Sequence, residues 1–427
     1  MRVIILLLLL IIGSNVNGRD LTLKEAIELA SNHSFELKKA KAQSQAYAEN
    51  VNAQKANRFP TLGLDAKALY NSETAQLDLE TPLFSLQREI GSNEIYQADL
   101  TLSVPLYTGG KISSGINLAQ ATYQMNRALE TATADKIEFL ARSEYLKLQQ
   151  ADMMIEVAQA SLDRIRVIKK DIFSAYSAGA ADSLNLIEVD FKFNEAQLAV
   201  DQALSLRRSR EIILSSLLGL ASDQGLRLTD KVSNPDISQI TFTGISDNKS
   251  ELSALNYAIE MNRHNKNLYR SSYFPTIALF GGYSYGKPNV DMFKDEFNGN
   301  FTVGAKLNWS FNLGGRTSSQ TKMAEFQIAS AQSEYDRVND DLTRQAKTAL
   351  ENLKLADKNF KIKSASYQLA QDNFRLAKAK QHAGGLSSNR LLEIENDLGQ
   401  SEAAMLTSKV EYQIILAQYN YIIGKGK

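Results

Sequence analysis

Two stretches of this chain, 111–176 and 316–381, contain no proline and each follows a double glycine. Apolar side chains recur in both at alternating steps of three and four residues, which is the spacing of a coiled-coil seam. At 1.5 Å per residue each predicted helix is about 100 Å long, far more than a globular domain accommodates. The seam positions are Leu148, Ala151, Ile155, Ala158, Leu162 and Ile165 in the first stretch, and Leu342, Ala346, Ala349, Leu353, Ala356 and Phe360 in the second.

The two long helices belong to an internal repeat. Matching dipeptides before the double glycines are offset by 215 residues, and later matches by 205. One insertion of about ten residues between Tyr70 and Tyr96 explains the change of offset. The matches are Glu36-Leu37 with Glu251-Leu252, Phe59-Pro60 with Phe274-Pro275, Gly109-Gly110 with Gly314-Gly315, Ala178-Gly179 with Ala383-Gly384, Glu188 with Glu393, and Leu218-Gly219 with Ile423-Gly424.

We therefore expect a first repeat at 19–225, a linker at 226–249 and a second repeat at 250–427. Each repeat is predicted to contain a helix, a β-hairpin, a very long helix, a tight turn and a return helix. In the first repeat these elements are a helix at 33–57, a hairpin at 59–107, a long helix at 111–178 and a return helix at 183–219. In the second they are a helix at 250–272, a hairpin at 274–313, a long helix at 316–382 and a return helix at 387–424.

Three of the four predicted strands alternate apolar and polar side chains at every second residue, as strands with two different faces do. Leu62, Leu64, Leu102 and Leu307 lie on the apolar face, and Asp99, Lys306 and Asn308 on the polar face. The strand from Thr276 to Tyr285 alternates less regularly, because Ala278 and Phe280 fall on its polar face, and the repeat identifies it.

The N-terminus predicts export. Met1 and Arg2 precede an apolar run from Val3 to Ile12, which is followed by a polar stretch ending at Gly18. This is the pattern of a secretory signal peptide at 1–18, with cleavage expected after Gly18. No later segment carries eighteen consecutive apolar residues, so a membrane location would require strands.

Composition excludes several classes of protein. The chain has no cysteine, which rules out disulfides and thiolate sites, and 48 basic residues balance 48 acidic ones, which disfavours nucleic acid as a partner. The three histidines, His33, His264 and His382, have no metal-ligand spacing and no triad partners, so we expect no cofactor, no metal and no catalysis. An enzyme is the weakest of the function classes considered.

In order and repetition, these features resemble the TolC family of outer-membrane efflux proteins. The resemblance covers nearly the whole chain after the signal peptide. It rests on the Phe-Pro hairpin entries, Val-Pro-Leu-Tyr-Thr-Gly-Gly at 104–110, Phe-Asn-Leu-Gly-Gly-Arg at 311–316, and the turns at Gly179 and Gly384.

The resemblance implies a mixed fold: a helical tunnel through the periplasm, and four strands per chain that a homotrimer pools into a twelve-stranded barrel in outer-membrane lipid. The linker at 226–249 would belong to an equatorial belt. A periplasmic adaptor and an inner-membrane pump of RND or ABC type would be the partners of this passive duct. Partner chains are also required on physical grounds. Four strands cannot close a barrel, and an open edge in lipid leaves backbone hydrogen-bonding groups unpaired.

The resemblance also assigns roles to particular residues. The two helix tips, around Tyr176, Gly179, Leu184, Gly384 and Leu386, would contact the adaptor. Glu393 and Glu188 would form an acidic gate ring, although Asn185 and Arg390 stand where acids are commoner. On the strands, Asp99, Lys306 and Asn308 would face the lumen, and Tyr70, Tyr285 and Trp309 would form an aromatic girdle.

Simpler alternatives stay open at this point. The strands could form an ordinary half-buried sheet, and the tip glycines could be plain helix caps. Charges such as Glu188, Asp190, Glu393 and Glu395 most often lie on solvated helix faces. The main functional alternative is a trimeric autotransporter adhesin, which pools four strands per chain but keeps them together at the C-terminus, whereas here the hairpins are about 170 residues apart.

Overall fold

The computed structural model describes residues 19–221, 225–237, 240–242, 244–291 and 293–425. The predicted signal peptide at 1–18 lies outside these residues. The chain divides into two compact units. Within the described residues, the helical unit comprises 19–40, 129–250 and 337–425, and the strand unit comprises 41–128 and 251–336.

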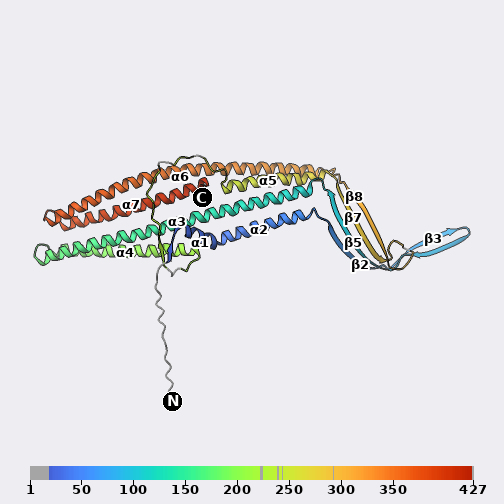
Figure 1. Cartoon of the computed structure of the whole chain (residues 1–427), viewed down its shortest axis with the longest axis horizontal. Coiled ribbons are helices and arrows are strands. Elements are labelled where there is room, and N and C mark those ends of the chain that lie inside the picture. The colour runs from blue at the N-terminus through green and yellow to red at the C-terminus, as the bar shows by residue number, and fades with distance from the viewer. Residues whose placement is uncertain (1–18, 222–224, 238–239, 243, 292, 426–427) are drawn as a thin grey trace, which may run out of the picture. The chain divides into compact units, whose positions relative to one another are not determined.

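Seven α-helices and eight strands make up the described part of the chain (Figure 1). The helices are α1 Leu23–His33, α2 Phe35–Ala56, α3 Lys111–Ser177, α4 Ser183–Leu218, α5 Ser250–Arg270, α6 Arg316–His382 and α7 Ser388–Ile423, with a 3₁₀ turn at Ser271–Tyr273. The strands are β1 Arg19–Leu21, β2 Thr61–Tyr70, β3 Ala75–Thr81, β4 Phe84–Ile90, β5 Glu94–Tyr107, β6 Leu226–Leu228, β7 Thr276–Lys287 and β8 Asn298–Asn308.

The long helices α3 and α6 each contain 67 residues and carry the predicted seam on their buried side. Figure 1 shows α4 lying along α3 and α7 along α6. The small alanines on the seam allow the helix axes to approach closely. Eight of the twelve predicted seam positions are buried, namely Leu148, Ala151, Leu162, Ile165, Ala346, Ala349, Leu353 and Ala356.

The helix predicted at 33–57 is present as α2, which begins at Phe35 after a break at Ser34 that separates it from α1. The Ser34 side chain accepts a hydrogen bond from the backbone N–H of Leu37 at 3.2 Å, which satisfies one of the free donors at the start of α2. Helix α1 was missed, and its Ala26 and Ala30 are fully buried against α3 and α4.

The segment predicted as a linker contains the short strand β6, which pairs in parallel with β1 in a two-stranded sheet. Strand β1 follows directly on the predicted signal peptide. The Tyr145 hydroxyl of α3 donates to the backbone oxygen of Leu21 at 3.0 Å and lies 3.0 Å from the Asp230 carboxylate. Burial raises the pKa of Tyr145 far above its ordinary value, so this hydroxyl keeps its proton and remains a donor.

The strand unit contains a four-stranded antiparallel sheet in the order β2-β5-β7-β8. The two predicted hairpins thus lie side by side, joined through β5 and β7. The hairpin predicted at 59–107 is present as the paired strands β2 and β5. The interval between them also holds β3 and β4, which form a separate two-stranded sheet that we did not predict.

Candidate functional site at the helix tips and the strand face

Each long helix ends in a turn built on a glycine with a left-handed backbone. Gly179 has φ +73° and Gly384 has φ +74°, and nothing lies within 4 Å of the Cβ position of either residue. The N–H of Ala180 donates to the oxygen of Ala175 at 2.8 Å, and that of Gly385 to Lys380 at 2.9 Å. These bonds close the helix ends and reverse the chain, so the glycines are helix caps whether or not the tips also bind a partner.

The return helices begin with side-chain caps. The Asp182 side chain accepts from the N–H of Asn185 at 3.1 Å, and Ser387 accepts from Arg390 at 3.4 Å. Of the apolar residues predicted at the tips, Tyr176 and Leu184 are exposed, whereas Leu386 packs on the buried cluster that α3, α4 and α7 share. The structure therefore leaves two of these side chains available to a partner and uses the third in the core.

The acidic residues near the tips have different surroundings. Glu393 is exposed and pairs with Arg390 at 2.6 Å, one helical turn away. Glu188 is partly buried, and its Oε2 atom has no hydrogen-bond partner among the described residues. Asp190 pairs with Lys169 at 2.7 Å, and that lysine also lies 4.7 Å above the ring of Phe193. The side chain of Lys169 thus joins α3 to α4.

A buried ion pair near the tips involves a residue to which we gave no site role, Glu395. Its side chain is 1% exposed, and its Oε1 atom accepts from Arg164 Nε at 3.0 Å and from the Ser161 hydroxyl at 2.8 Å. This ion pair links α7 to α3. Its signal in the sequence is a carboxylate at a core position of α7, four residues after Leu391 and three before Leu398, both of which are buried.

Burial raises the pKa of Glu395, although Ser161 and Arg164 act in the opposite direction because both favour the carboxylate. The Nη2 atom of Arg164 is buried without a hydrogen-bond partner among the described residues. An ion pair that is only partly satisfied and largely desolvated stabilises little as a whole, yet losing either partner is costly. Such an ion pair can therefore form and break with a small net change in free energy.

The register of the sheet brings the predicted polar residues to one face. Asp99 lies opposite Ser284, which lies opposite Asn300, while Lys306 and Asn308 follow at even steps along β8. The Gln97 amide donates to the Asp99 carboxylate at 2.8 Å and to the Ser284 hydroxyl at 3.1 Å. Leu62, Leu64, Leu102 and Leu307 all lie on the other face, as the two-residue period requires.

The irregular strand β7 follows the same register. Ala278 and Phe280 do point to the polar face, and the Phe280 ring covers Gly304 on the neighbouring strand. A Cβ atom at Gly304 would lie 2.9 Å from the ring, so this position requires glycine. The aromatic ring shields the backbone that the missing side chain leaves open, which explains an apolar residue on a polar face.

The predicted girdle residues lie at or beside strand ends and are exposed. Tyr70 is the last residue of β2. Tyr285 stacks on Phe297 with ring centroids 5.7 Å apart, and the Trp309 indole N–H donates to the backbone oxygen of Tyr273 at 3.2 Å. Each thus presents an aromatic surface, and the Trp309 N–H also has a polar partner.

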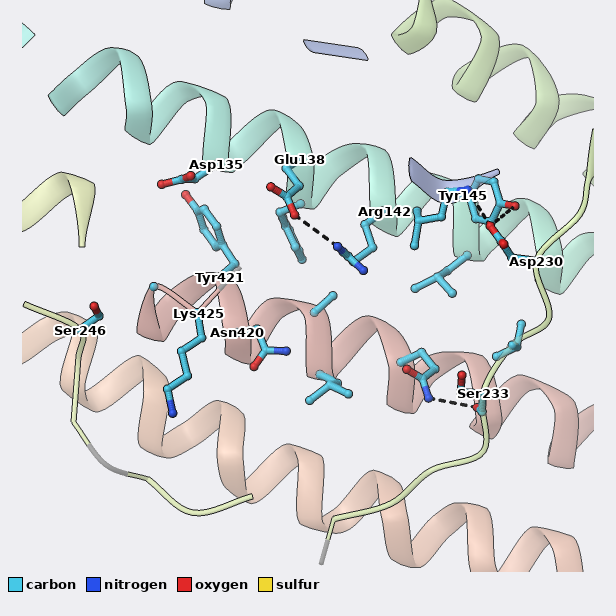
Figure 2. A pocket seen from close by; sticks show the side chains of 18 of the residues that line it. Asp135, Glu138, Arg142, Tyr145, Asp230, Ser233, Ser246, Asn420, Tyr421 and Lys425 are labelled. Carbon is cyan, nitrogen blue, oxygen red and sulfur yellow. Dashed lines mark hydrogen bonds and ion pairs between the residues drawn. The ribbon is translucent and has the colours of Figure 1, made fainter. Parts of the chain in front are cut away.

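A cavity of about 690 Å³ lies in the helical unit between α3, α7 and the segment that joins the repeats (Figure 2). Its walls carry charges of both signs, and several of these are already paired. Arg142 bonds Glu138 at 3.2 Å, Ser250 donates to Asp135 at 2.7 Å, and Lys249 donates to the backbone oxygen of Tyr421 at 2.8 Å. No histidine is among the described residues that line this cavity.

Among the residues that the structure describes, no group of three or more histidine, cysteine, aspartate or glutamate side chains is placed to hold a metal ion. The same residues contain no helix that is both long enough and apolar enough to cross a bilayer.

Comparison of the sequence with known proteins indicates one family. The family model described as outer membrane efflux protein matches residues 26–220 and 245–425. Outer membrane protein OprJ of Pseudomonas aeruginosa is 23% identical over 424 residues, which cover 95% of this chain and 85% of OprJ. Outer membrane protein TolC of Vibrio cholerae is 27% identical over 250 residues, covering 53% of this chain and 56% of that protein. A crystal structure of CusC superposes with a TM-score of 0.77 at 16% identity, over 95% of this chain and 92% of CusC.

Proposed function

Because the chain belongs to the outer membrane efflux protein family, it is an outer-membrane efflux channel, and we propose that three copies assemble into one continuous passive duct. In this assembly the strand units of three chains supply a twelve-stranded barrel in outer-membrane lipid. The helical units supply a periplasmic tunnel, with residues 226–249 in a belt around it. Nothing supports the alternative of an adhesin, and the two halves of the sheet are separated in the chain by α3 and α4.

The main observation in favour of a trimer is a pair of exposed apolar stripes in the helical unit. One runs along α6 at every seventh residue, and the other along α4 at steps of four and seven, with each member 56% to 71% exposed. Apolar residues at heptad spacing are coiled-coil seams that need a partner. The stripes are Leu355, Ile362, Leu369 and Leu376 on α6, and Ile187, Phe191 and Leu198 on α4.

The two stripes fit a three-fold assembly. A cyclic trimer uses two different patches, one on each side of every chain, and here α6 of one chain would pack on α4 of the next. The four-stranded sheet needs neighbours in the same way, because β2 and β8 are edge strands. Pairing β8 of one chain with β2 of the next would give twelve strands without a free edge, which hydrocarbon surroundings require.

Strand parity tests the lipid-facing assignment. We expect arginine at Leu64 or Leu102 to impair insertion at a cost of about 2 to 4 kcal/mol near mid-membrane, because the charge would face hydrocarbon, and at Leu307, two residues from Trp309, to cost less. Arginine at Asp99 or Asn308, on the polar face, should be tolerated since it would face a water-filled lumen. Heat-modifiable trimer bands in outer-membrane fractions measure insertion. Equal tolerance on both faces would contradict the assignment.

In the helical unit, the tips around Tyr176, Gly179, Leu184, Gly384 and Leu386 would dock a periplasmic adaptor. The adaptor would join the duct to an inner-membrane pump of RND or ABC type, which supplies the energy. We assign the gate to the same region, where Glu393 and Glu188 of three chains would form an acidic ring. The Arg164–Glu395 pair would hold the two helical hairpins of each chain together in the closed state.

Two substitutions of opposite sign test the acidic ring. Glu393→Gln removes three carboxylates from the ring, so we expect lower cation selectivity in planar bilayers. Arg390→Gln removes the cation that partly neutralises Glu393, so selectivity for cations should rise. Reversal potentials in a salt gradient report both changes, and the matched pair separates a ring effect from general damage to the tip. If neither variant shifts the reversal potential, the tip charges do not face the pore.

Co-purification tests the proposed function as a whole. Living cells expressing the tagged chain are treated with a membrane-permeable crosslinker, and partners are identified by mass spectrometry after outer-membrane extraction. We expect one adaptor and one inner-membrane pump, recovered with wild type and lost with Gly384→Pro. Proline cannot adopt φ +74° and lacks the N–H that Gly384 donates to Gln381. If no pump is recovered with either the wild-type chain or the Gly384→Pro variant, the proposed duct is contradicted.

A further inference from the structure

The two helical hairpins of the chain, α3–α4 and α6–α7, are copies of each other. Every bound of α6 and α7 lies 205 residues after the matching bound of α3 and α4, so that equivalent helices have the same length, 67 or 36 residues. The bonds that close the tips match as well, since the bond from Ala180 to Ala175 recurs as that from Gly385 to Lys380. A contact observed on one hairpin can therefore be transferred to the other at this offset.

Equivalent positions of the two hairpins differ in exposure along one kind of surface. Val157 on α3 is 7% exposed, but its equivalent on α6, Ile362, is 63% exposed. Leu392 on α7 is 4% exposed, whereas its equivalent on α4, Ile187, is 65% exposed. Helices α3 and α7 lie next to each other, while α6 and α4 are the outer helices of the helical unit (Figure 1). The exposed positions are thus those whose copies are covered inside the chain.

The contact of α3 with α7 has a defined register. The Ser161 hydroxyl donates to Glu395 at 2.8 Å, and Arg164, one turn later, donates to the same carboxylate. A Cβ atom built at Gly399 would lie 4.0 Å from the Cβ atom of Ser161. Ser161 is therefore level with the segment from Glu395 to Gly399.

We propose that each contact between neighbouring chains of the trimer repeats the α3–α7 contact in this register, an inference that rests on the proposed trimer. Transferred by 205 residues, Ser161 corresponds to Ser366 on α6, and Gly399 corresponds to Asn194 on α4 of the next chain. Three chains then form a ring of six hairpins in which every step turns by the same angle, about 60°, as a closed cyclic assembly allows.

The heights of the tips and the size of the side chains support this register. Cyclic symmetry places all three chains at one height, so the register between chains follows from the two tips of one chain, which are level in Figure 1. The small residues Ala160 and Ser161 recur as Ala365 and Ser366. Helix α6 can therefore approach α4 of the next chain as closely as α3 approaches α7.

The charges near this level do not oppose the contact. Leu369 takes the place of Arg164, and Asp190 takes the place of Glu395, so the buried ion pair has no counterpart between chains. Asp190 is already paired with Lys169 of its own chain at 2.7 Å, so a neighbouring chain need not supply a cation for it. The contact between chains is apolar where the contact within a chain is ionic.

Cysteine pairs test the register, since the chain has no cysteine of its own. Asn194→Cys with Ser366→Cys places two exposed thiols at the expected contact. The trimer is first verified by native mass spectrometry of the reduced protein, and then copper phenanthroline is added. Denaturing electrophoresis without reductant should show covalent trimers, because each chain is linked to both neighbours. In the control, Ser161→Cys with Gly399→Cys, the disulfide should stay within one chain, since 4.0 Å between Cβ atoms suits that bond.

Positions one heptad away supply matched controls for the register. Asn359 and Asn373 lie about 10 Å before and after Ser366 on the same side of α6. Neither Asn359→Cys nor Asn373→Cys, each combined with Asn194→Cys, should give covalent trimers. Crosslinking at either position as efficient as at Ser366, or at none of the three in a verified trimer, would overturn the repeated contact while leaving the duct intact. A reduced protein that is only monomeric would instead overturn the proposed trimer together with this contact.

Discussion

Replacing Leu369 with aspartate is expected to abolish the trimer. Leu369 is the most exposed member of the α6 stripe, and we infer that it is buried against α4 of the neighbouring chain. Losing its burial and desolvating a carboxylate there costs about 3 kcal/mol or more at each interface. Three-fold symmetry applies this cost three times. Native mass spectrometry of the detergent-extracted protein should show monomer in place of trimer.

The preceding residue supplies the matched control. Gln368 is exposed and lies about 100° around α6 from Leu369, away from the stripe. Gln368→Asp introduces the same charge in the same helical turn and should leave the trimer intact. A trimer that survives Leu369→Asp, or one that both variants disrupt equally, would show that the stripe is not the seam between chains.

Arg164→Ala should loosen the helix tips by about 3 to 5 kcal/mol, because it leaves the buried Glu395 carboxylate without its cation. The expected effect is local, since this pair joins α3 to α7 near the ends of both helices. Hydrogen exchange at residues 161–165 and 391–398 should accelerate, while exchange near the middle of the long helices stays at the wild-type rate. In planar bilayers the same variant should spend more time in a wider state.

A double substitution separates the role of the ion pair from that of packing. Arg164→Met combined with Glu395→Leu replaces the pair with apolar side chains of similar size, so most of the lost stability should return. The stability of a buried apolar pair does not depend on protonation, so this channel should also lose its response to pH. A double variant as unstable as Arg164→Ala would show that apolar packing of similar size cannot replace the charges and hydrogen bonds of the pair.

The sign of that pH response follows from the raised pKa of Glu395. A carboxyl group with a higher pKa in the folded state holds its proton more tightly there than after unfolding. This contribution to the free energy of unfolding is present below the ordinary glutamate pKa, and it is lost as pH rises through the raised value. Tip protection, which is the exchange rate corrected for the intrinsic pH dependence of amide exchange, should therefore fall over this range in wild type and not in Glu395→Gln.

Much of the architecture could be predicted because it depends on local periodicities in the order of apolar and polar residues. A two-residue alternation, a three-four alternation and glycines at the turns depend only on backbone geometry. They placed β2, β5 and β8 and the bounds of α3, α4, α6 and α7 within one or two residues. The duplication placed β7, whose own alternation is disturbed by Phe280, a disturbance that the structure explains through Gly304 on the adjacent strand.

What the sequence alone determined about this protein was therefore its elements, their faces and its family. Tertiary structure decided which charged side chains are buried. Glu393 and Glu395 are two residues apart, about 200° around one helix, and only the position of α3 makes the second a buried partner of Arg164 while the first pairs at the surface. It also decided that β3 and β4 form their own sheet and that β5 pairs with β7. Contacts between segments far apart in the chain depend on packing and loop closure, which no local period encodes.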